Sequence, residues 1–321
     1  MKLRIKIINT LKNWMRRLTS EPIDIAVHKI THTNNFLMFQ MTANSLTEKA
    51  LNSSILGIAK EKYCGENEVI VSMTTYWKRL SEVHLAIESV MQGSMKPNRI
   101  ILWLSDELRS KDLPITLKRQ MSRGLEINYC KDIKSYTKLI PTLMLYPDAC
   151  IITIDDDAIY PYDLIENMVN AYRQNPNYIY TNRMHRIIMG DNRRPLSYLK
   201  WDWCANNDEA SHKNFFTGVG GVLYPPSSLN NEVFNESVFM SICESADDVW
   251  FNAMALLNGT KVKKVFTHSA GGTDYLLNNN VQDTALWKFN ANSGTGDCKN
   301  DTQIAAVYSR YNLYEKLNES S

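Results

Sequence analysis

The sequence lacks a long hydrophobic run and a strong charge of one sign. No apolar stretch approaches the roughly 18 residues that a membrane-spanning helix needs, so we expect no transmembrane segment. The formal net charge of +2 is too small to indicate nucleic-acid binding. With 44% apolar and 22% charged residues, the 321-residue chain has the composition of an ordinary globular enzyme.

Paired cysteines are also missing. None of the cysteines belongs to a Cys-x-x-Cys pair, which excludes the usual zinc-site spacing and a small disulfide framework. Cys150 and Cys243 lie in apolar stretches, where we expect core thiols. A reducing cytoplasm is therefore the expected compartment. The six cysteines are Cys64, Cys130, Cys150, Cys204, Cys243 and Cys298.

The most informative feature that is present is an acidic loop directly after a strand. Residues 150–154 are β-leaning and mostly apolar, and Asp155, Asp156 and Asp157 follow them. Three like charges at the end of a buried strand repel one another, so the sequence predicts a positive group nearby. A divalent cation with oxygen ligands fits and leaves positions for substrate phosphates. The alternative is an acidic turn that faces water.

Strand-like segments alternate with helical ones, which predicts an α/β fold with a mainly parallel central sheet and flanking helices. The carboxyl ends of such strands share one edge, where ligands bind. We expect an N-terminal extension up to residue 66, a catalytic domain over 67–270 and a polar tail over 271–321. The expected strands are 68–73, 98–105, 125–129, 150–154, 178–181, 218–224 and 261–267, and the expected helices are 79–91, 113–122, 135–145, 163–173 and 245–257.

The first 19 residues predict a basic amphipathic helix, because they carry six cations and no acid, with apolar residues at helical spacing. They lack the continuous apolar core of a secretory signal. Such a helix either lies on an anionic membrane, which would hold the protein peripherally at the inner face, or packs on its own domain. Liposome binding that is unchanged after deletion of residues 1–19 would exclude the first alternative.

Four segments in this order resemble the GT-A class of nucleotide-sugar glycosyltransferases, in particular inverting, family 2-like bacterial enzymes. They are the strand at 69–75, the DxD-type acidic loop at 155–157, the glycine-rich segment at 218–225 and the Asp-Asp-Val-Trp-Phe sequence at 247–251. The resemblance covers about residues 67–270. It implies a GT-A-like fold with a nucleotide-binding first half. It also implies metal-dependent transfer of one sugar to a glycan or lipid-linked acceptor, as in surface polysaccharide biosynthesis.

The resemblance also implies a metal site for Mn²⁺ or Mg²⁺. In the family the last Asp of the loop binds the metal and the first contacts the nucleotide ribose, which gives these roles to Asp157 and Asp155. Because a run of three leaves the register open, Asp155 is also a metal candidate and Asp156 fits either role. His268 follows the last expected strand and is a candidate third ligand, with a structural or surface histidine as the alternative.

Donor and catalytic candidates stand at the ends of the expected strands. An acceptor hydroxyl needs a base, and Asp247 and Asp248 at a helix start are candidates, with plain helix capping as the alternative. Lys138 would reach the donor base or phosphates, with a solvent-exposed lysine as the alternative. The full set of donor-binding candidates is Thr74, Thr75, Tyr76, Arg79, Asp106, Lys138, Asp155 and Asp156.

Acceptor candidates follow the acidic loop in sequence. Gly220 and Gly221 would let the backbone approach the acceptor closely, with a strand bulge as the alternative. Trp250 would stack on a sugar face or belong to the core. The irregular segment 182–216 suits a substrate-facing loop region. Its basic residues at 183, 185 and 186 either meet a phosphate or an acidic acceptor or are ordinary surface groups.

The chain departs from the family in two respects. An aspartate replaces the usual glutamate of the Glu-Asp base motif, so the identity of the base stays open. The Gln-x-x-Arg-Trp motif of processive members is absent, which favours transfer of a single sugar over polymerisation. Two alternatives remain. One is a sugar-phosphate nucleotidyltransferase, although residues 73–79 lack its glycines, and the other is a non-catalytic nucleotide- or carbohydrate-binding protein.

Overall fold

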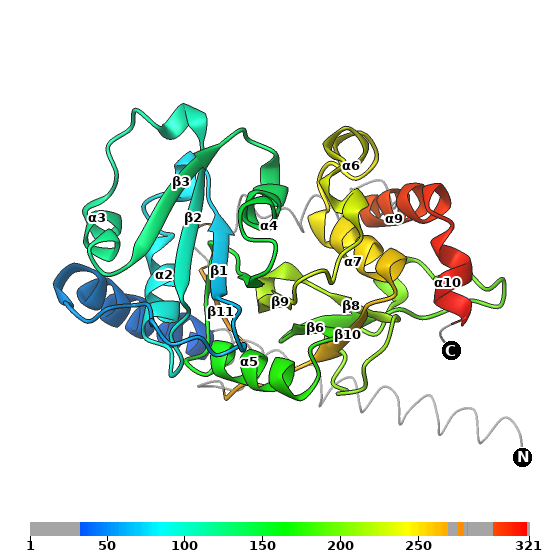
Figure 1. Ribbon diagram of the computed structural model, residues 1–321, viewed down its shortest axis with the longest axis horizontal. Helices are drawn as coiled ribbons and strands as arrows, with labels where there is room; N and C mark the ends of the chain where they lie inside the picture. The colour runs from blue at the N-terminus through cyan, green and yellow to red at the C-terminus, as the bar shows by residue number, and fades with distance from the viewer. Residues whose placement is uncertain (1–32, 269–274, 279–280, 282–297, 320–321) are drawn as a thin grey trace, which may run out of the picture. The chain divides into compact units, whose positions relative to one another are not determined.

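The computed structural model describes residues 33–268, 275–278, 281 and 298–319 (Figure 1). The chain divides into two compact units, residues 1–44 and residues 45–321. In the first unit the described residues are helical, and this helix ends at residue 52 in the second. The amphipathic helix expected at residues 1–19 lies outside the described residues. The predicted domain boundaries at 66 and 270 stay predictions.

A seven-stranded sheet organises the second unit, in the order β10-β6-β9-β4-β1-β2-β3. Every pair in it is parallel except those made by β9, which runs antiparallel to both β4 and β6. The predicted α/β class with a mainly parallel sheet is therefore confirmed. The strands are β1 Val69–Thr74, β2 Arg99–Ser105, β3 Leu125–Cys130, β4 Cys150–Thr153, β6 Tyr178–Thr181, β9 Val222–Tyr224 and β10 Lys261–Lys264.

Both faces of this sheet are buried, which explains why its central strands are almost wholly apolar. Because side chains alternate along a strand, neighbouring residues of β1 enter different cores. Ile70 packs with Ile101 and Ile151 on one face, whereas Val71 packs with Leu102 on the other.

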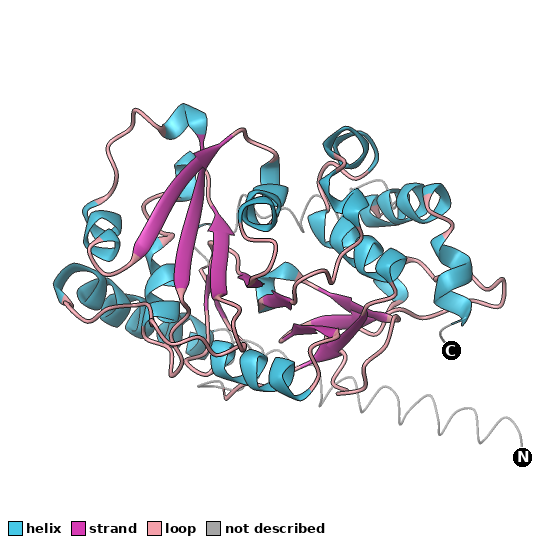
Figure 2. Ribbon diagram, viewed as in Figure 1, coloured by secondary structure: helices cyan, strands magenta, loops and turns pink. Residues whose placement is uncertain are grey.

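Helices cover the two faces separately (Figures 1 and 2). One core contains residues of α2 (His84–Met91), α3 (Ile115–Met121) and α5 (Leu164–Gln174). The other contains residues of α4 (Ile140–Leu145), α6 (Glu236–Ile242), α7 (Asp247–Asn258), α9 (Lys299–Arg310) and α10 (Leu313–Glu319). The last two lie in the segment expected to be a polar tail, and Figure 1 shows them beside α7.

The structure differs from the sequence-based expectation around the glycine-rich segment. A strand was expected over 218–224, but Gly218–Gly220 form a 3-10 turn, η5, and only β9 is extended. Gly221 joins the two with a φ of 84°, a backbone conformation that favours glycine. This turn brings residue 218 to the carboxyl end of β4.

Smaller elements complete the unit. The irregular segment 182–216 contains an antiparallel pair, β7 Met184–Arg186 with β8 Asn214–Phe216, and β5 Ala158–Ile159 pairs with β11 Leu276–Leu277. The 3-10 helices are η1 Trp77–Arg79, η2 Asp106–Leu108, η3 Lys134–Lys138, η4 Tyr198–Lys200 and η6 Asn231–Phe234. Within the described ranges, no helix has the length and apolar character to cross a membrane.

Candidate active site

The acidic loop lies at the carboxyl end of β4, beside the end of β1. The parallel register pairs Ser72 with Thr153, so the residues after these strands face each other. Thr75 donates a hydrogen bond from Oγ1 to Oδ2 of Asp156 at 2.5 Å. Nη1 of Arg79 lies 2.7 Å from Oδ1 of Asp156 and 3.0 Å from Oδ2 of Asp157. Arg79 therefore supplies part of the positive charge that was predicted to compensate the three carboxylates.

These contacts separate the roles of the three carboxylates. Asp156 is 8% exposed, and each of its carboxylate oxygens already accepts a hydrogen bond. Burial raises its pKa, while Arg79 and Thr75 lower it. Asp156 therefore anchors the loop, and a donor contact through its carboxylate would require one of these bonds to break. The side chain of Asp155 is 29% exposed and is the more accessible oxygen donor of the loop.

Lys138 connects the acidic loop to the start of α7. Its Nζ lies 2.8 Å from Oδ1 of Asp155 and 3.0 Å from Oδ2 of Asp247. The side chain is only 7% exposed, so the alternative of a solvent-exposed lysine is wrong. Ser72 on β1 donates a hydrogen bond to the carbonyl oxygen of Lys138 at 2.6 Å and thereby ties η3 to the sheet. A buried ammonium that bridges two carboxylates fixes the distance between the two acidic segments.

Asp247 and Asp248 differ sharply in surroundings. The residue that caps α7 is Ala246, and neither carboxylate makes a side-chain cap, so the capping alternative is wrong. Asp248 accepts a hydrogen bond at Oδ1 from the backbone N–H of Gly218 at 3.0 Å. Burial raises the pKa of Asp248 to about 7, with Asp247 adding to the shift and Lys138 opposing it. A carboxyl group with this proton affinity suits a general base at neutral pH.

Gly218 lies at the centre of this arrangement and was not singled out from the sequence. A Cβ at this position would come within 2.5 Å of Nζ of Lys138, 3.1 Å of Oδ1 of Asp248 and 3.4 Å of Oδ1 of Asp155. The absence of a side chain therefore lets Lys138 sit between the carboxylates. The glycine-rich motif was the available signal, but it did not indicate which of its glycines faces the carboxylates.

Replacing Gly218 with Ala is expected to displace Lys138 and lower the activity of the site at least about tenfold, because small misplacements of catalytic groups are costly. Turnover and thermal stability of the variant would be measured together. Gly190→Ala is a matched control, since its nearest contact is a flexible leucine carbon at 3.1 Å. Full activity of Gly218→Ala would show that the position of Lys138 is unimportant.

Gly220 and Gly221 serve packing within the protein. A Cβ on Gly220 would lie 2.5 Å from Cβ of Arg183, and one on Gly221 would lie 3.2 Å from a methyl group of Leu164. Both glycines are buried. Their close approach to an acceptor stays a prediction, whereas their close approach to Arg183 and α5 is a property of the fold.

Trp250 corrects one expectation. Its side chain is fully buried, its indole N–H donates to the carbonyl oxygen of Val233 at 3.2 Å, and its ring packs on Phe239 and Tyr311. A ring enclosed in this way has no face to offer a sugar. The prediction that Trp250 binds the acceptor is therefore wrong, and the core alternative holds.

The remaining candidates occupy the ends of β1, β2 and β10. Thr74 donates to the carbonyl oxygen of Trp103 at 3.1 Å, and Tyr76 is 40% exposed. Asp106 forms an exposed ion pair with Arg109 at 2.7 Å. His268 donates its backbone N–H to Asp163 and places Nδ1 2.8 Å from the same oxygen, with its ring 88% exposed.

The predicted ligands of a divalent cation do not form a complete set within the described residues. Among residues 33–268, 275–278, 281 and 298–319, no three His, Cys, Asp or Glu side chains are grouped to hold a metal ion. Asp155, Asp157 and His268 are thus not assembled as a closed site. Mg²⁺, however, is usually held by one or two carboxylates together with water and substrate phosphates. Asp155 and Asp157 at one loop fit that form of binding, while the role of His268 stays a prediction.

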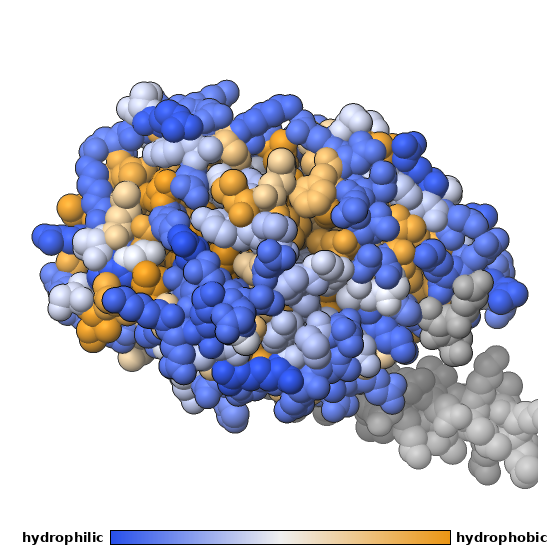
Figure 3. Space-filling model, viewed as in Figure 1, coloured by the Kyte–Doolittle hydropathy of each residue, from blue (hydrophilic) through white to orange (hydrophobic). Residues whose placement is uncertain are grey.

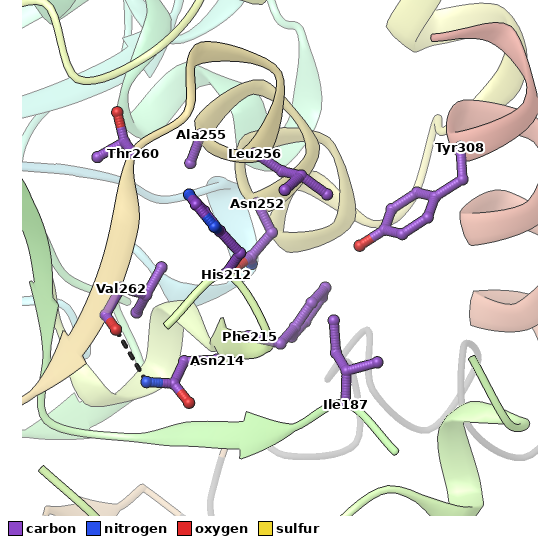
Figure 4. A pocket seen from close by; sticks show the side chains of 10 residues that line it. All are labelled: Ile187, His212, Asn214, Phe215, Asn252, Ala255, Leu256, Thr260, Val262 and Tyr308. Carbon is purple, nitrogen blue, oxygen red and sulfur yellow. Dashed lines mark hydrogen bonds between the residues drawn. The ribbon is translucent and has the colours of Figure 1, made fainter. Parts of the chain in front are cut away.

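A small pocket elsewhere in the unit has no part in this site. It has a volume of about 10 Å³, which is room for roughly one water molecule. Figure 4 shows it between the β7–β8 pair, α7 and Tyr308 of α9. The buried Nδ1 of His212, which lines it, has no hydrogen-bond partner. Such a cavity suits a structural water and is too small for a substrate. The face in Figure 3 is mostly hydrophilic, with hydrophobic residues scattered among the hydrophilic ones.

Comparisons with solved structures give distant likenesses, of which two are described below. No protein-family model and no curated protein matches the chain. The chain is similar to a CMP:2-keto-3-deoxy-manno-octonic acid synthetase solved with CTP, at 9% identity and a TM-score of 0.42, over 68% of this chain and 96% of that one. It is also similar to S. aureus TarS 1–349, at 12% identity and a TM-score of 0.44, over 78% and 73%. Neither likeness is strong enough to carry a statement about activity.

Proposed function

We propose that the chain transfers a single sugar from a nucleotide-sugar donor to a hydroxyl group of a glycan or lipid-linked acceptor, with inversion. The observation that carries this proposal is the position of Asp248. It is a carboxyl group with a pKa of about 7 that accepts a hydrogen bond from Gly218. Its neighbour Asp247 is joined to Asp155 of the acidic loop through Lys138. A base near neutral pH beside a site suited to phosphates is what such a transfer needs.

The proposed reaction is an in-line displacement. The acceptor oxygen attacks the anomeric carbon, its proton passes to the carboxylate of Asp248, and the bond between that carbon and the diphosphate breaks. Asp247 is less suited to this role because the ammonium of Lys138 already occupies its carboxylate, at 3.0 Å from Oδ2. The nucleoside diphosphate then leaves with the bonding electron pair.

The leaving diphosphate accumulates negative charge, which a divalent cation neutralises when bound. Asp155 and Asp157 are the residues that would hold it. Arg79 keeps Asp157 in place at 3.0 Å, and Lys138 does the same for Asp155 at 2.8 Å. We include in the proposal that the protein attaches to a membrane and takes part in polysaccharide assembly. Both depend on whether the acceptor is lipid-linked.

Replacing Asp157 with Asn is expected to lower metal-dependent nucleotide release about 100-fold, since loss of a metal ligand removes several kcal/mol of charge stabilisation. The assay measures nucleotide release from a panel of UDP-, GDP-, CMP- and dTDP-sugars, with and without Mg²⁺ or Mn²⁺. Asp112→Asn is the control, because that side chain is 89% exposed and its ion pair among the described residues is with Lys118. Release by Asp157→Asn at the wild-type rate would contradict the assigned role.

Two further measurements beside this assay separate the alternatives. Release of pyrophosphate from a nucleoside triphosphate and a sugar phosphate would indicate a nucleotidyltransferase. Tight nucleotide binding without turnover in the presence of a wide range of acceptors would indicate a binding protein. Release of a nucleotide from one sugar nucleotide identifies the donor.

A further inference from the structure

Arg183 is a partly enclosed arginine, and no carboxylate of the described residues pairs with it. It follows β6, is half-buried and donates from Nη1 to Oγ1 of Thr217 at 2.7 Å. The thiol of Cys204 and the hydroxyls of Tyr198 and Tyr275 lie near enough to influence its pKa. Among the described residues, no Asp or Glu forms an ion pair with it. A guanidinium has five N–H donors, so the bond to Thr217 leaves others available.

Arg79 and Arg123, which are more deeply buried than Arg183, behave differently. Arg79 is paired with the acidic loop, and Arg123 is paired with Glu88 at 2.9 Å. Withdrawing a cation from water is costly unless an anion compensates it. Arg183 bears part of this cost without an anion from the described residues, which is the pattern expected when a ligand supplies the anion.

The position of Arg183 connects it to the proposed base. Thr217, its hydrogen-bond partner, immediately precedes Gly218, whose N–H bonds Asp248. Burial raises the pKa of the Tyr198 hydroxyl, Asp248 raises it further and Arg183 lowers it, so this hydroxyl lies within the field of both groups. Trp203, which is 40% exposed and 5.4 Å from Tyr198 between ring centroids, provides an accessible ring nearby.

The η5 turn separates Arg183 from the donor side. Gly218 at one end of the turn lies against Lys138, and Gly220 at the other end lies against Arg183. Lys138 and Arg79 are both engaged by carboxylates of the acidic segments. An acidic site of this kind repels an anionic acceptor unless it offers a further cation. In the described part of the site, Arg183 is the cation that carboxylates leave available.

Resting on the proposed function, we infer that Arg183 binds an anionic group, a phosphate or a carboxylate, carried by the acceptor. The acceptor is accordingly an acidic glycan or a phosphate-containing chain rather than a neutral sugar. The planar guanidinium suits either anion, because it can bind two oxygens at once.

Calorimetric titration of the full chain with inorganic phosphate and with glucuronate tests this inference and shows which anion is preferred. Phosphate or glucuronate should bind the wild type, and Arg183→Ala should weaken that binding at least about tenfold, a loss typical of a charge-assisted bidentate contact. Arg194→Ala removes the same charge from an exposed residue that contacts Tyr314 and should bind as the wild type does. Arg183→Lys, which keeps the charge, serves if the alanine variant does not fold, and its affinity should also fall.

Affinity for nucleoside diphosphates, measured on the same variants, should stay within about twofold of the wild type, because the inferred contact is with the acceptor. Loss of nucleotide binding in Arg183→Ala would assign the residue to the donor and overturn the inference. Equal anion affinity in the wild type and Arg183→Ala, or no anion binding at millimolar concentration, would overturn the inference as well. Since these titrations need no turnover, Arg183-dependent anion binding without nucleotide release would count against the proposed function alone.

Discussion

Replacing Asp248 with Asn is expected to lower kcat for sugar transfer by about 10²–10⁴-fold, the usual contribution of a general base. The asparagine keeps the shape of the side chain and a hydrogen-bond acceptor for Gly218. It cannot take up the acceptor proton. Substrate binding should change little, so the loss should appear in kcat rather than in KM. Steady-state kinetics with the donor found in the release assay would measure both.

The pH profile distinguishes Asp248 from its neighbour. The base works as a carboxylate, and burial raises its pKa to about 7. In the wild type, kcat/KM should therefore fall below pH 7 as Asp248 becomes protonated and level off above it. Asp247→Asn removes a like charge next to Asp248, so the midpoint should move to lower pH while turnover persists. A profile that keeps its midpoint near 7 in Asp248→Asn would assign this titration to another group.

Replacing Arg123 with Met is expected to lower the free energy of unfolding by about 3–5 kcal/mol, because it leaves a buried carboxylate unpaired. Glu88 has no exposed surface, and the side chain of Arg123 is 2% exposed. Both terminal nitrogens of Arg123 bond this carboxylate, at 2.9 and 3.0 Å, and Gln120 adds a bond at 3.0 Å. Urea denaturation followed by circular dichroism would measure the change.

The matched surface control is Arg109→Met, whose pair with Asp106 is 62% and 55% exposed and is worth at most about 1 kcal/mol. A double variant, Glu88→Leu with Arg123→Met, should recover most of the loss, since it removes the orphaned charge along with its partner. If Arg123→Met proves as stable as the Arg109 control, Glu88 takes up a proton or reaches water when its partner is gone.

The strands could be predicted because the sheet is buried on both faces. Runs such as residues 150–152 and 100–104 are apolar at every position, and burial on two sides is the simplest reason for such a run. The direction of β9 could not be predicted in the same way. Its three residues are equally apolar, and an apolar run carries no signal of whether a strand runs parallel or antiparallel to its neighbours.

The candidate site could also be predicted only in part. The run Asp155–Asp157 indicated an acidic loop with a compensating positive group, because three neighbouring like charges repel one another. The sequence did not reveal that Asp156 faces inward, since three identical residues carry no signal of orientation. The prediction that Trp250 binds the acceptor was wrong for a related reason. A helical pattern indicates that one face is buried, but it does not show which large residue lies at the centre of that face. The pairing of Lys138 with Asp247 spans more than a hundred residues and has no local signature.

The antiparallel strand β9 also has a consequence for how the chain is made. During synthesis β1 to β4 emerge early and can pair with one another, but the second neighbour of β4 is β9, which begins only at Val222. Until then β4 is an open edge whose four residues are all buried in the finished fold. An unpaired apolar edge is a template for aggregation. A nascent chain therefore passes through a vulnerable interval of about 70 residues, several seconds at ordinary rates of translation.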